Sequence, residues 1–183
     1  MTLQTKDTTL LRLGGWAAYA SGVVGAAAVA FLIAMIASFA SGAMETGTGY
    51  GRVNDVLAIF QYLLAVPCPI ALHALLPRRS PFRTWLVTLI GVSAFAAIVV
   101  LQTLLVVGAL PFNIQGGLVI IALLVLGVWM VLTGSRGSAR GLLPHGVRMG
   151  LVGATYFGYP IWAFWLGRHL LRLARLRAST TDA

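Results

Sequence analysis

The stretch that decides the fold runs from Gly14 to Ala40 and reads GGWAAYASGVVGAAAVAFLIAMIASFA. It contains no charged residue, and at about 1.5 Å per residue a helix of this length exceeds the roughly 30 Å hydrocarbon core of a bilayer. We therefore expect a tilted membrane-spanning helix. The stretch is too long for the apolar region of a signal peptide, so we interpret it as part of the folded protein.

The rest of the chain shares this character. Of its 183 residues, 59% are hydrophobic and 9% are charged, whereas a soluble domain carries roughly 25% charged residues. So few charges could not cover the surface of a water-soluble fold of this size, and most of that surface must face lipid. We expect one membrane domain, residues 1–183, with an all-α fold.

Four further apolar runs follow the first. Together they predict a bundle of about five transmembrane helices, at residues 14–40, 53–76, 84–108, 116–133 and 149–167. The Gly-rich segment 42–52 is expected to be a loop, which puts Asp55 at the entrance of the second helix, paired with Arg52. In the tail, 168–183, leucines alternate with arginines at helical spacing, which predicts an interfacial C-terminal helix.

The charge distribution predicts the topology. Thirteen Lys and Arg residues face four acidic ones, giving a net charge of +9, and the basic residues gather between the apolar runs and in the tail. No aromatic residues interleave with these charges, so we expect contact with anionic lipid headgroups and not with nucleic acid. The positive-inside rule places the N-terminus and the segments 77–83 and 134–148 in the cytoplasm. The Ala- and Arg-rich composition suits a high-GC bacterium, and we expect the protein in the bacterial inner membrane.

The fifth apolar run leaves two alternatives open. Five crossings, which we favour, would place the basic tail outside, against the positive-inside rule. Alternatively, the run re-enters the membrane with the help of Pro160, and the tail returns to the cytoplasm.

Small residues recur at every fourth position in two of the runs. Such stripes let helix backbones approach closely in a membrane, where no hydrophobic effect drives helices together. They predict either packing within the chain or a face for a partner subunit, a second copy or a flat ligand. The positions are Gly14, Ala18, Gly22, Ala26, Ala30, Ala34 and Ser38 in the first run, and Gly146, Gly150, Ala154 and Gly158 in the fifth.

Two further features lie inside the runs. Pro67 and Pro69 are expected to kink the second helix, because each removes an amide donor. Polar residues gather toward the expected outer side, where they predict hydrogen bonds between helices, notably from Gln61 to Gln102, or alternatively a polar pocket. This group consists of Asn54, Asp55, Gln61, Gln102 and Gln115.

Catalysis and cofactor binding receive little support. The four acidic residues share no membrane-embedded site, and no nucleophile has a base beside it, so we expect a protein that is not an enzyme. The single cysteine, Cys68, forms no disulfide within the chain and belongs to no cysteine cluster. His73 and His145 are weak candidates for haem ligands near the cytoplasmic surface. The cofactor content stays unknown.

Several motifs resemble a large group of uncharacterised bacterial multipass membrane proteins. These are Gly127-Val128-Trp129 through Gly134, Gly141-Leu142-Leu143-Pro144, the Gly-rich segment from Gly150 to Gly153, and Arg12-Leu13-Gly14-Gly15 with Tyr19. The resemblance covers about half of the chain and implies a helical membrane architecture of about six helices. It implies no catalytic residues, because the group is a domain of unknown function.

Three functional hypotheses follow, in this order. The first is a non-enzymatic subunit or binding module of a membrane assembly, which contacts another subunit, a second copy or a lipid-like ligand through its small-residue faces. The second is a component of a small-solute transporter or channel, suggested by the kink beside Gln61 and Gln102. The third is a redox subunit associated with haem or quinone.

Overall fold

The computed structural model describes residues 2–75 and 81–179, and the regular structure of these residues is entirely helical. Leu76, Arg78 and Arg79 lie outside the described residues, as do the side chains of Lys6 and Arg83. The helices are α1 (Thr2–Ala40), α2 (Met44–Ala65), α3 (Pro67–His73), α4 (Pro81–Val106), α5 (Phe112–Ser138), α6 (Gly146–Gly153) and α7 (Tyr159–Ser179).

Four segments of this structure are long and apolar enough to cross a membrane. They are Asp7–Ala40, Met44–His73, Thr84–Val106 and Phe112–Ser138. The prediction of a helical membrane protein is therefore confirmed for four spans, and the expected fifth crossing is not confirmed.

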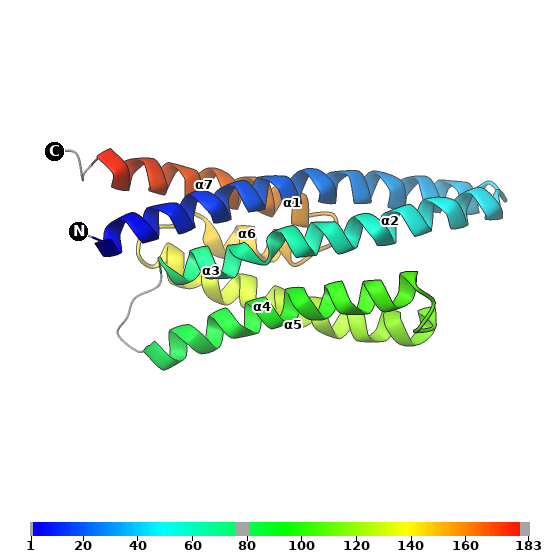
Figure 1. Cartoon of the computed structure of the whole chain (residues 1–183). Helices are drawn as coiled ribbons and strands as arrows, with labels where there is room; N and C mark the ends of the chain where they lie inside the picture. The colour runs from blue at the N-terminus through cyan, green and yellow to red at the C-terminus, as the bar shows by residue number, and fades with distance from the viewer. Residues whose placement is uncertain (1, 76–80, 180–183) are drawn as a thin grey trace.

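The helices form two antiparallel hairpins, α1 with α2–α3 and α4 with α5, joined where α2 packs against α4 (Figure 1). Helix α6 packs on α5, and α7 packs along α1. The start of α1, the α5–α6 connection and the end of α7 lie at one end of the bundle, which we call the basic end. It carries the exposed residues Arg12, Arg140, Arg148, Arg168, Arg172 and Arg175. The α1–α2 and α4–α5 turns lie at the opposite end, the turn end (Figure 1).

The continuous helix expected at 149–167 is wrong, because the chain reverses at residues 154–158. The Gly158 amide donates to Thr155 Oγ1 at 3.0 Å, and the Tyr159 amide donates to the Thr155 carbonyl at 3.0 Å. Pro160 occupies the first turn of α7, where a missing amide costs no helical hydrogen bond. Helices α6 and α7 thus form a short hairpin whose two arms both point to the basic end (Figure 1).

The tail continues this hairpin. Its residues are helical as far as Ser179, as the leucine and arginine spacing predicts. Leu170 and Ala174 are fully buried, so this part of α7 packs against the bundle instead of standing apart from it.

The loop expected at 42–52 is also wrong, since α2 already begins at Met44. The glycines that suggested a loop instead permit close packing of α1 on α2. A Cβ on Gly47 would overlap the Phe39 ring, and one on Gly51 would approach Met35 Sδ to 3.0 Å. Tertiary contact has overridden the low helix propensity of glycine here.

The helix is interrupted at the two prolines where the sequence predicts a kink. Helix α2 ends at Ala65, α3 begins at Pro67, and the Val66 amide donates to the Leu63 carbonyl in a tight turn at 3.2 Å. The thiol of Cys68, which lies between the prolines, is directed at the Gly14 carbonyl at 3.7 Å.

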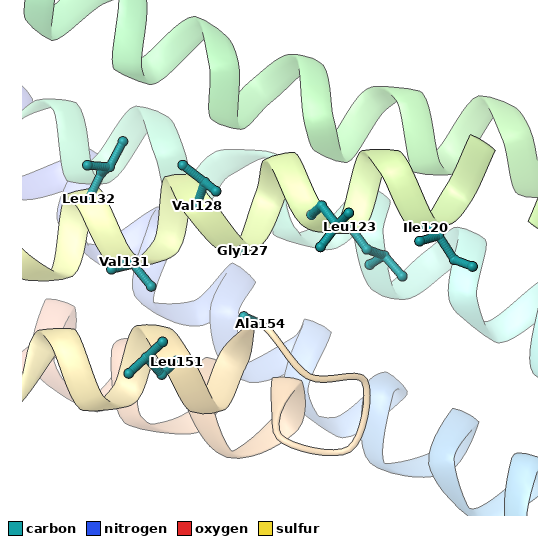
Figure 2. Close-up of a pocket in the computed structure, with 9 residues that line it drawn as sticks. Ile120, Leu123, Gly127, Val128, Val131, Leu132, Leu151 and Ala154 are labelled. Atoms are coloured by element: carbon teal, nitrogen blue, oxygen red, sulfur yellow. The ribbon is translucent and has the colours of Figure 1, made fainter. Parts of the chain in front are cut away.

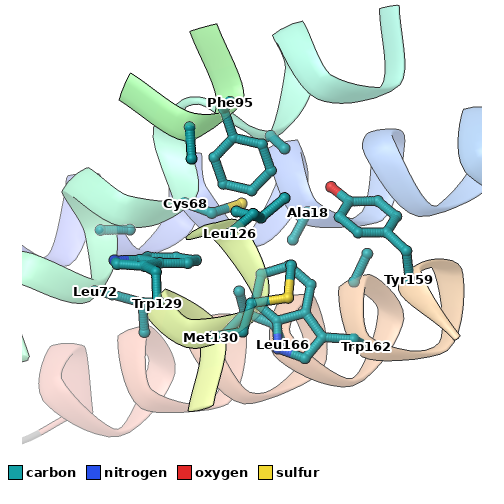
Figure 3. Close-up of a cluster of buried hydrophobic side chains, with 14 of the residues drawn as sticks. Ala18, Cys68, Leu72, Phe95, Leu126, Trp129, Met130, Tyr159, Trp162 and Leu166 are labelled. Carbon is teal, nitrogen blue, oxygen red and sulfur yellow. The ribbon is translucent and has the colours of Figure 1, made fainter. Parts of the chain in front are cut away.

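The core lies in the half of the bundle nearer the basic end, where α6 and α7 complete the packing. Figure 3 shows side chains converging there from α1, α3, α4, α5 and α7. Trp129 makes edge contacts with Phe95 and Trp162, at ring separations of 5.9 and 6.4 Å. Toward the turn end the α6–α7 hairpin stops, and in the described part of the chain α1 and α5 form no packed pair.

Candidate functional site

The first element of the candidate site is Asp55, which lies on α2 in a segment that is long and apolar enough to span a membrane. Because α2 starts at Met44, Asp55 falls within the candidate span Met44–His73. The position of Asp55 along the bundle axis, relative to α4, follows from the contact of Tyr62 with Phe95, whose rings lie 6.2 Å apart. Helices α2 and α4 are antiparallel, and Asp55 and Gln102 each lie two turns from this contact, so they are level with each other.

Asp55 belongs to a polar group at the tip of the α6–α7 hairpin, formed with Asn54 and Tyr156. We call these three residues the tip cluster. The Tyr156 hydroxyl donates to Asn54 Oδ1 at 2.7 Å, and the Asn54 side chain also engages the Asp55 carboxyl group. Tyr156 interacts electrostatically with Asp55. Asn54 is buried, whereas Asp55 and Tyr156 are half-buried, so the cluster is reachable from the side.

The expected pair of Asp55 with Arg52 is absent among the residues that the structure describes. Arg52 is exposed on α2, while the side chain that engages the Asp55 carboxyl group is that of Asn54. The α6–α7 hairpin places the Tyr156 phenol beside this part of α2. The sequence of α2 alone could not predict that neighbour. Tyr156 was missed by sequence reasoning, and its only signal was the polar interruption at Thr155 and Tyr156 within the fifth run.

A second polar group lies deeper, at Ser21, Gln61 and Tyr159. Ser21 Oγ donates to the Gln61 carbonyl at 2.8 Å and lies 2.6 Å from the Tyr159 hydroxyl. Since a serine has one hydroxyl proton, Tyr159 is the donor to Ser21. The Gln61 side chain packs against Gly25, and its Oε1 is buried without a hydrogen-bond partner in the described structure. This group ties α1, α2 and α7 together.

The expected hydrogen bond from Gln61 to Gln102 does not form. Gln102 instead accepts a hydrogen bond from Gln115 Nε2 at 2.9 Å, and both side chains are buried between α4 and α5. The five polar residues grouped from the sequence therefore divide into Asn54 and Asp55 in the tip cluster, Gln61 at a deeper level, and the pair of Gln102 and Gln115 that joins two helices.

The first small-residue stripe is divided between packing and exposure. A Cβ on Gly14 would overlap that of Ala71 in α3, and one on Gly22 would meet the Phe164 ring of α7 at 3.3 Å. Ala18 is fully buried, but Ala26 and Ala30 are exposed, while Ala34 and Ser38 are half-buried.

The second stripe packs within the chain, on α5. A Cβ on Gly146 would overlap the Gly134 backbone, and one on Gly150 would come within 2.7 Å of the Met130 carbonyl oxygen. Ala154 Cβ lies 3.0 Å from the position of a Cβ on Gly127. Gly158 serves the reversal, because a Cβ there would overlap the Val152 carbonyl oxygen.

An apolar groove follows α5 beside α6 (Figure 2). It has a volume of about 430 Å³ and continues past the hairpin tip, from Leu132 to Ile120. Leu151 and Ala154 form its other wall, and Gly127 forms part of its floor. Its walls are apolar, and the residues that line it include no polar side chain that could select a particular ligand.

The two histidines considered as haem ligands occupy different settings. His73 Nδ1 lies 2.8 Å from Thr88 Oγ1, and its ring contacts Trp85. His145 is exposed just before α6, an element that forms no packed pair with α3. Within the described ranges, no three His, Cys, Asp or Glu residues gather as a metal site would require.

Comparison with other proteins assigns no family or function to this chain. No protein-family model, no curated protein and no solved structure matches this chain. The resemblance to an uncharacterised multipass family therefore stays a prediction.

Proposed function

We propose that this protein is a four-crossing membrane protein with a re-entrant hairpin, α6–α7, which binds a small polar solute at the tip cluster, as a component of a transporter or channel. In this arrangement all exposed arginines of the basic end share the cytoplasmic side, which agrees with the positive-inside rule. The proposal also resolves the conflict that five crossings create for the tail, which is then cytoplasmic and carried by α7.

The observation that carries this proposal is the half-buried Asp55 facing a break between two helices. An ionisable side chain inside a spanning segment is costly and usually functional. Irregular backbone at membrane depth is tolerated where it is buried in protein or lines a hydrated cavity, and broken helices commonly form the binding sites of transporters. Residues 154–158 provide such a break, and the hydrogen bond of Tyr156 joins it to Asn54, next to Asp55.

The chemistry of the tip cluster favours a cationic or hydrogen-bond-donating solute. Asp55 supplies a carboxylate, and the Asn54 amide and the Tyr156 phenol supply neutral polar groups beside it. Small cations such as Na⁺, K⁺, guanidinium and tetramethylammonium are therefore the first solutes to test.

Proteoliposome currents provide the test. Concentration jumps of these four cations should evoke a current in the native protein, and Asp55→Asn should reduce it at least about tenfold, because the variant removes the charge and keeps the shape. Glu45→Gln makes the same change on an exposed residue of α2 and should leave the current unaltered. Absence of current with every cation, or an unaltered current in Asp55→Asn, would refute the proposal.

A second candidate function is that of a subunit in a membrane assembly, and the exposed part of the α1 stripe favours it. Ala26 and Ala30 are exposed one turn apart, beyond the point where α7 covers the helix. Small exposed residues allow a neighbouring helix to approach closely. A second copy of the chain or another membrane subunit would supply that helix.

Disulfide cross-linking in native membranes tests this second candidate. Cys68 is buried, so the chain provides a background for single engineered cysteines. Ala30→Cys should form a cross-linked product, whereas Ala97→Cys, the same change on the exposed face of α4, should not. Equal products from both variants would indicate random collision, and no product from Ala30→Cys would remove the case for a second copy of the chain there.

A further inference from the structure

A second cleft lies near the basic end, between α1 and α7. It has a volume of about 390 Å³ and is lined by Tyr19, Phe164, Trp165, Arg168, His169 and Arg172. The cleft exists because α1 and α7 approach closely beside it: a Cβ on Gly167 would lie 2.9 Å from the Gly15 carbonyl oxygen. It is separate from the tip cluster, which lies at the other end of α7.

Its lining divides into a cationic rim and an aromatic floor. Arg168 and Arg172 are exposed and one turn apart on α7, so both guanidinium groups can reach one ligand. The rings of Tyr19 and Phe164 lie 5.9 Å apart, and Trp165 packs on His169 at 4.8 Å. His169 Nδ1 is 2.9 Å from the Trp165 carbonyl oxygen and donates to it, which fixes the imidazole against the floor.

These groups match the phosphate and glycerol region of a phospholipid. Paired arginines bind phosphate oxygens with bidentate, charge-assisted hydrogen bonds. Tyrosine and tryptophan are enriched at the level where headgroups meet acyl chains. Trp16, one turn before Tyr19, is 65% exposed and provides a further anchor at that level. Acidic side chains are absent from this lining, so an anion meets no like charge there.

We infer that this cleft is a specific site for an anionic phospholipid of the leaflet at the basic end, with the lipid phosphate between Arg168 and Arg172 and the glycerol region on the aromatic floor. The inference requires the basic end to lie at a membrane surface. It does not depend on the solute-binding role of the tip cluster, so either proposal can fail alone.

Native mass spectrometry of the full chain in mild detergent tests the site, with phosphatidylglycerol as the probe. The native protein should retain phosphatidylglycerol and not phosphatidylcholine, and soluble glycerol 3-phosphate should not displace it. Arg168→Gln with Arg172→Gln should weaken phosphatidylglycerol binding at least about tenfold, since two charge-assisted contacts are lost. Arg140→Gln with Arg148→Gln removes the same charge from exposed positions at the same end, and should change binding less than about twofold.

Three outcomes would overturn the inference. An equal loss in both double variants would assign the binding to the general positive potential of the basic end. Unchanged binding in the Arg168 and Arg172 variant would mean that the cleft is not the site. Displacement by glycerol 3-phosphate at comparable concentration would identify a soluble phosphate ligand and not a lipid. Circular dichroism of each variant checks that helix content is retained.

Discussion

At the residue scale, the packing of α5 against α6 depends on glycines that face backbone. Gly134 and Gly146 contact each other across the two helices, and neither position has space for a Cβ. Gly150 contacts the Met130 carbonyl in the same interface. Close backbone approach gains dispersion energy, which is a principal attraction between helices in a lipid environment.

Gly134→Ala should therefore destabilise the protein by about 1–3 kcal/mol, because the added methyl group meets the Gly146 backbone, which cannot rotate away. Thermal unfolding in detergent, followed by circular dichroism, measures the effect. Gly116→Ala is the matched control in the same helix, where a Cβ has open space. It should be neutral or stabilising by up to about 1 kcal/mol. Equal destabilisation by both variants would contradict this account.

At the element scale, the first stripe illustrates what a residue spacing can and cannot predict. Every fourth position advances 400° around a helix, so successive members rotate by about 40° and the series winds around α1. The buried series instead includes Ala18, Ser21, Gly25 and Ala28, with a spacing of three and four. A neighbouring helix contacts residues at this alternating spacing of three and four. For that reason Gly14 and Ala18 pack, while Ala26 and Ala30 are exposed.

The hairpin α6–α7 gives the element-scale prediction, which concerns topology. Ser179→Cys and Arg140→Cys should react with a membrane-impermeant maleimide from the same side of the membrane, and Thr46→Cys should react from the other side. All three positions are exposed, and the native Cys68 is buried and should not react. Labelling of Ser179→Cys together with Thr46→Cys would show that the fifth segment crosses the membrane.

At the scale of the whole molecule, the core beneath the hairpin tip joins elements that are distant in the chain. Trp162 of α7 contacts Trp129 of α5 and Tyr159, and its side chain occupies the space where Gly153 of α6 lacks a Cβ. Ser21 reaches Tyr159 across 138 positions of sequence. These contacts hold the two long hairpins to α6–α7, which makes the half of the bundle toward the basic end the more completely packed one.

Trp162→Ala should accordingly cost about 3–5 kcal/mol, because it leaves a large cavity among side chains from three helices. Trp16→Ala deletes the same side chain where it is 65% exposed, and should cost less than about 1 kcal/mol. Unfolding by titration with a denaturing detergent compares the two. Similar losses would indicate that the bundle is not packed around Trp162.

The sequence by itself determined the helical class of this protein, the four segments that are long and apolar enough to span a membrane, and the break at Pro67 and Pro69. These follow from properties that are local in the chain: long uncharged runs, and prolines that lack an amide donor. The tertiary structure decided the rest. The glycines of 42–52 form helix because Phe39 and Met35 pack against them, and the fifth run turns back at Thr155. Asn54, the neighbour of Asp55, acquires its hydrogen bond from Tyr156 only because a hairpin distant in sequence reaches it. Such contacts depend on which helices meet and at what level, and the spacing of residues within one helix does not contain that information.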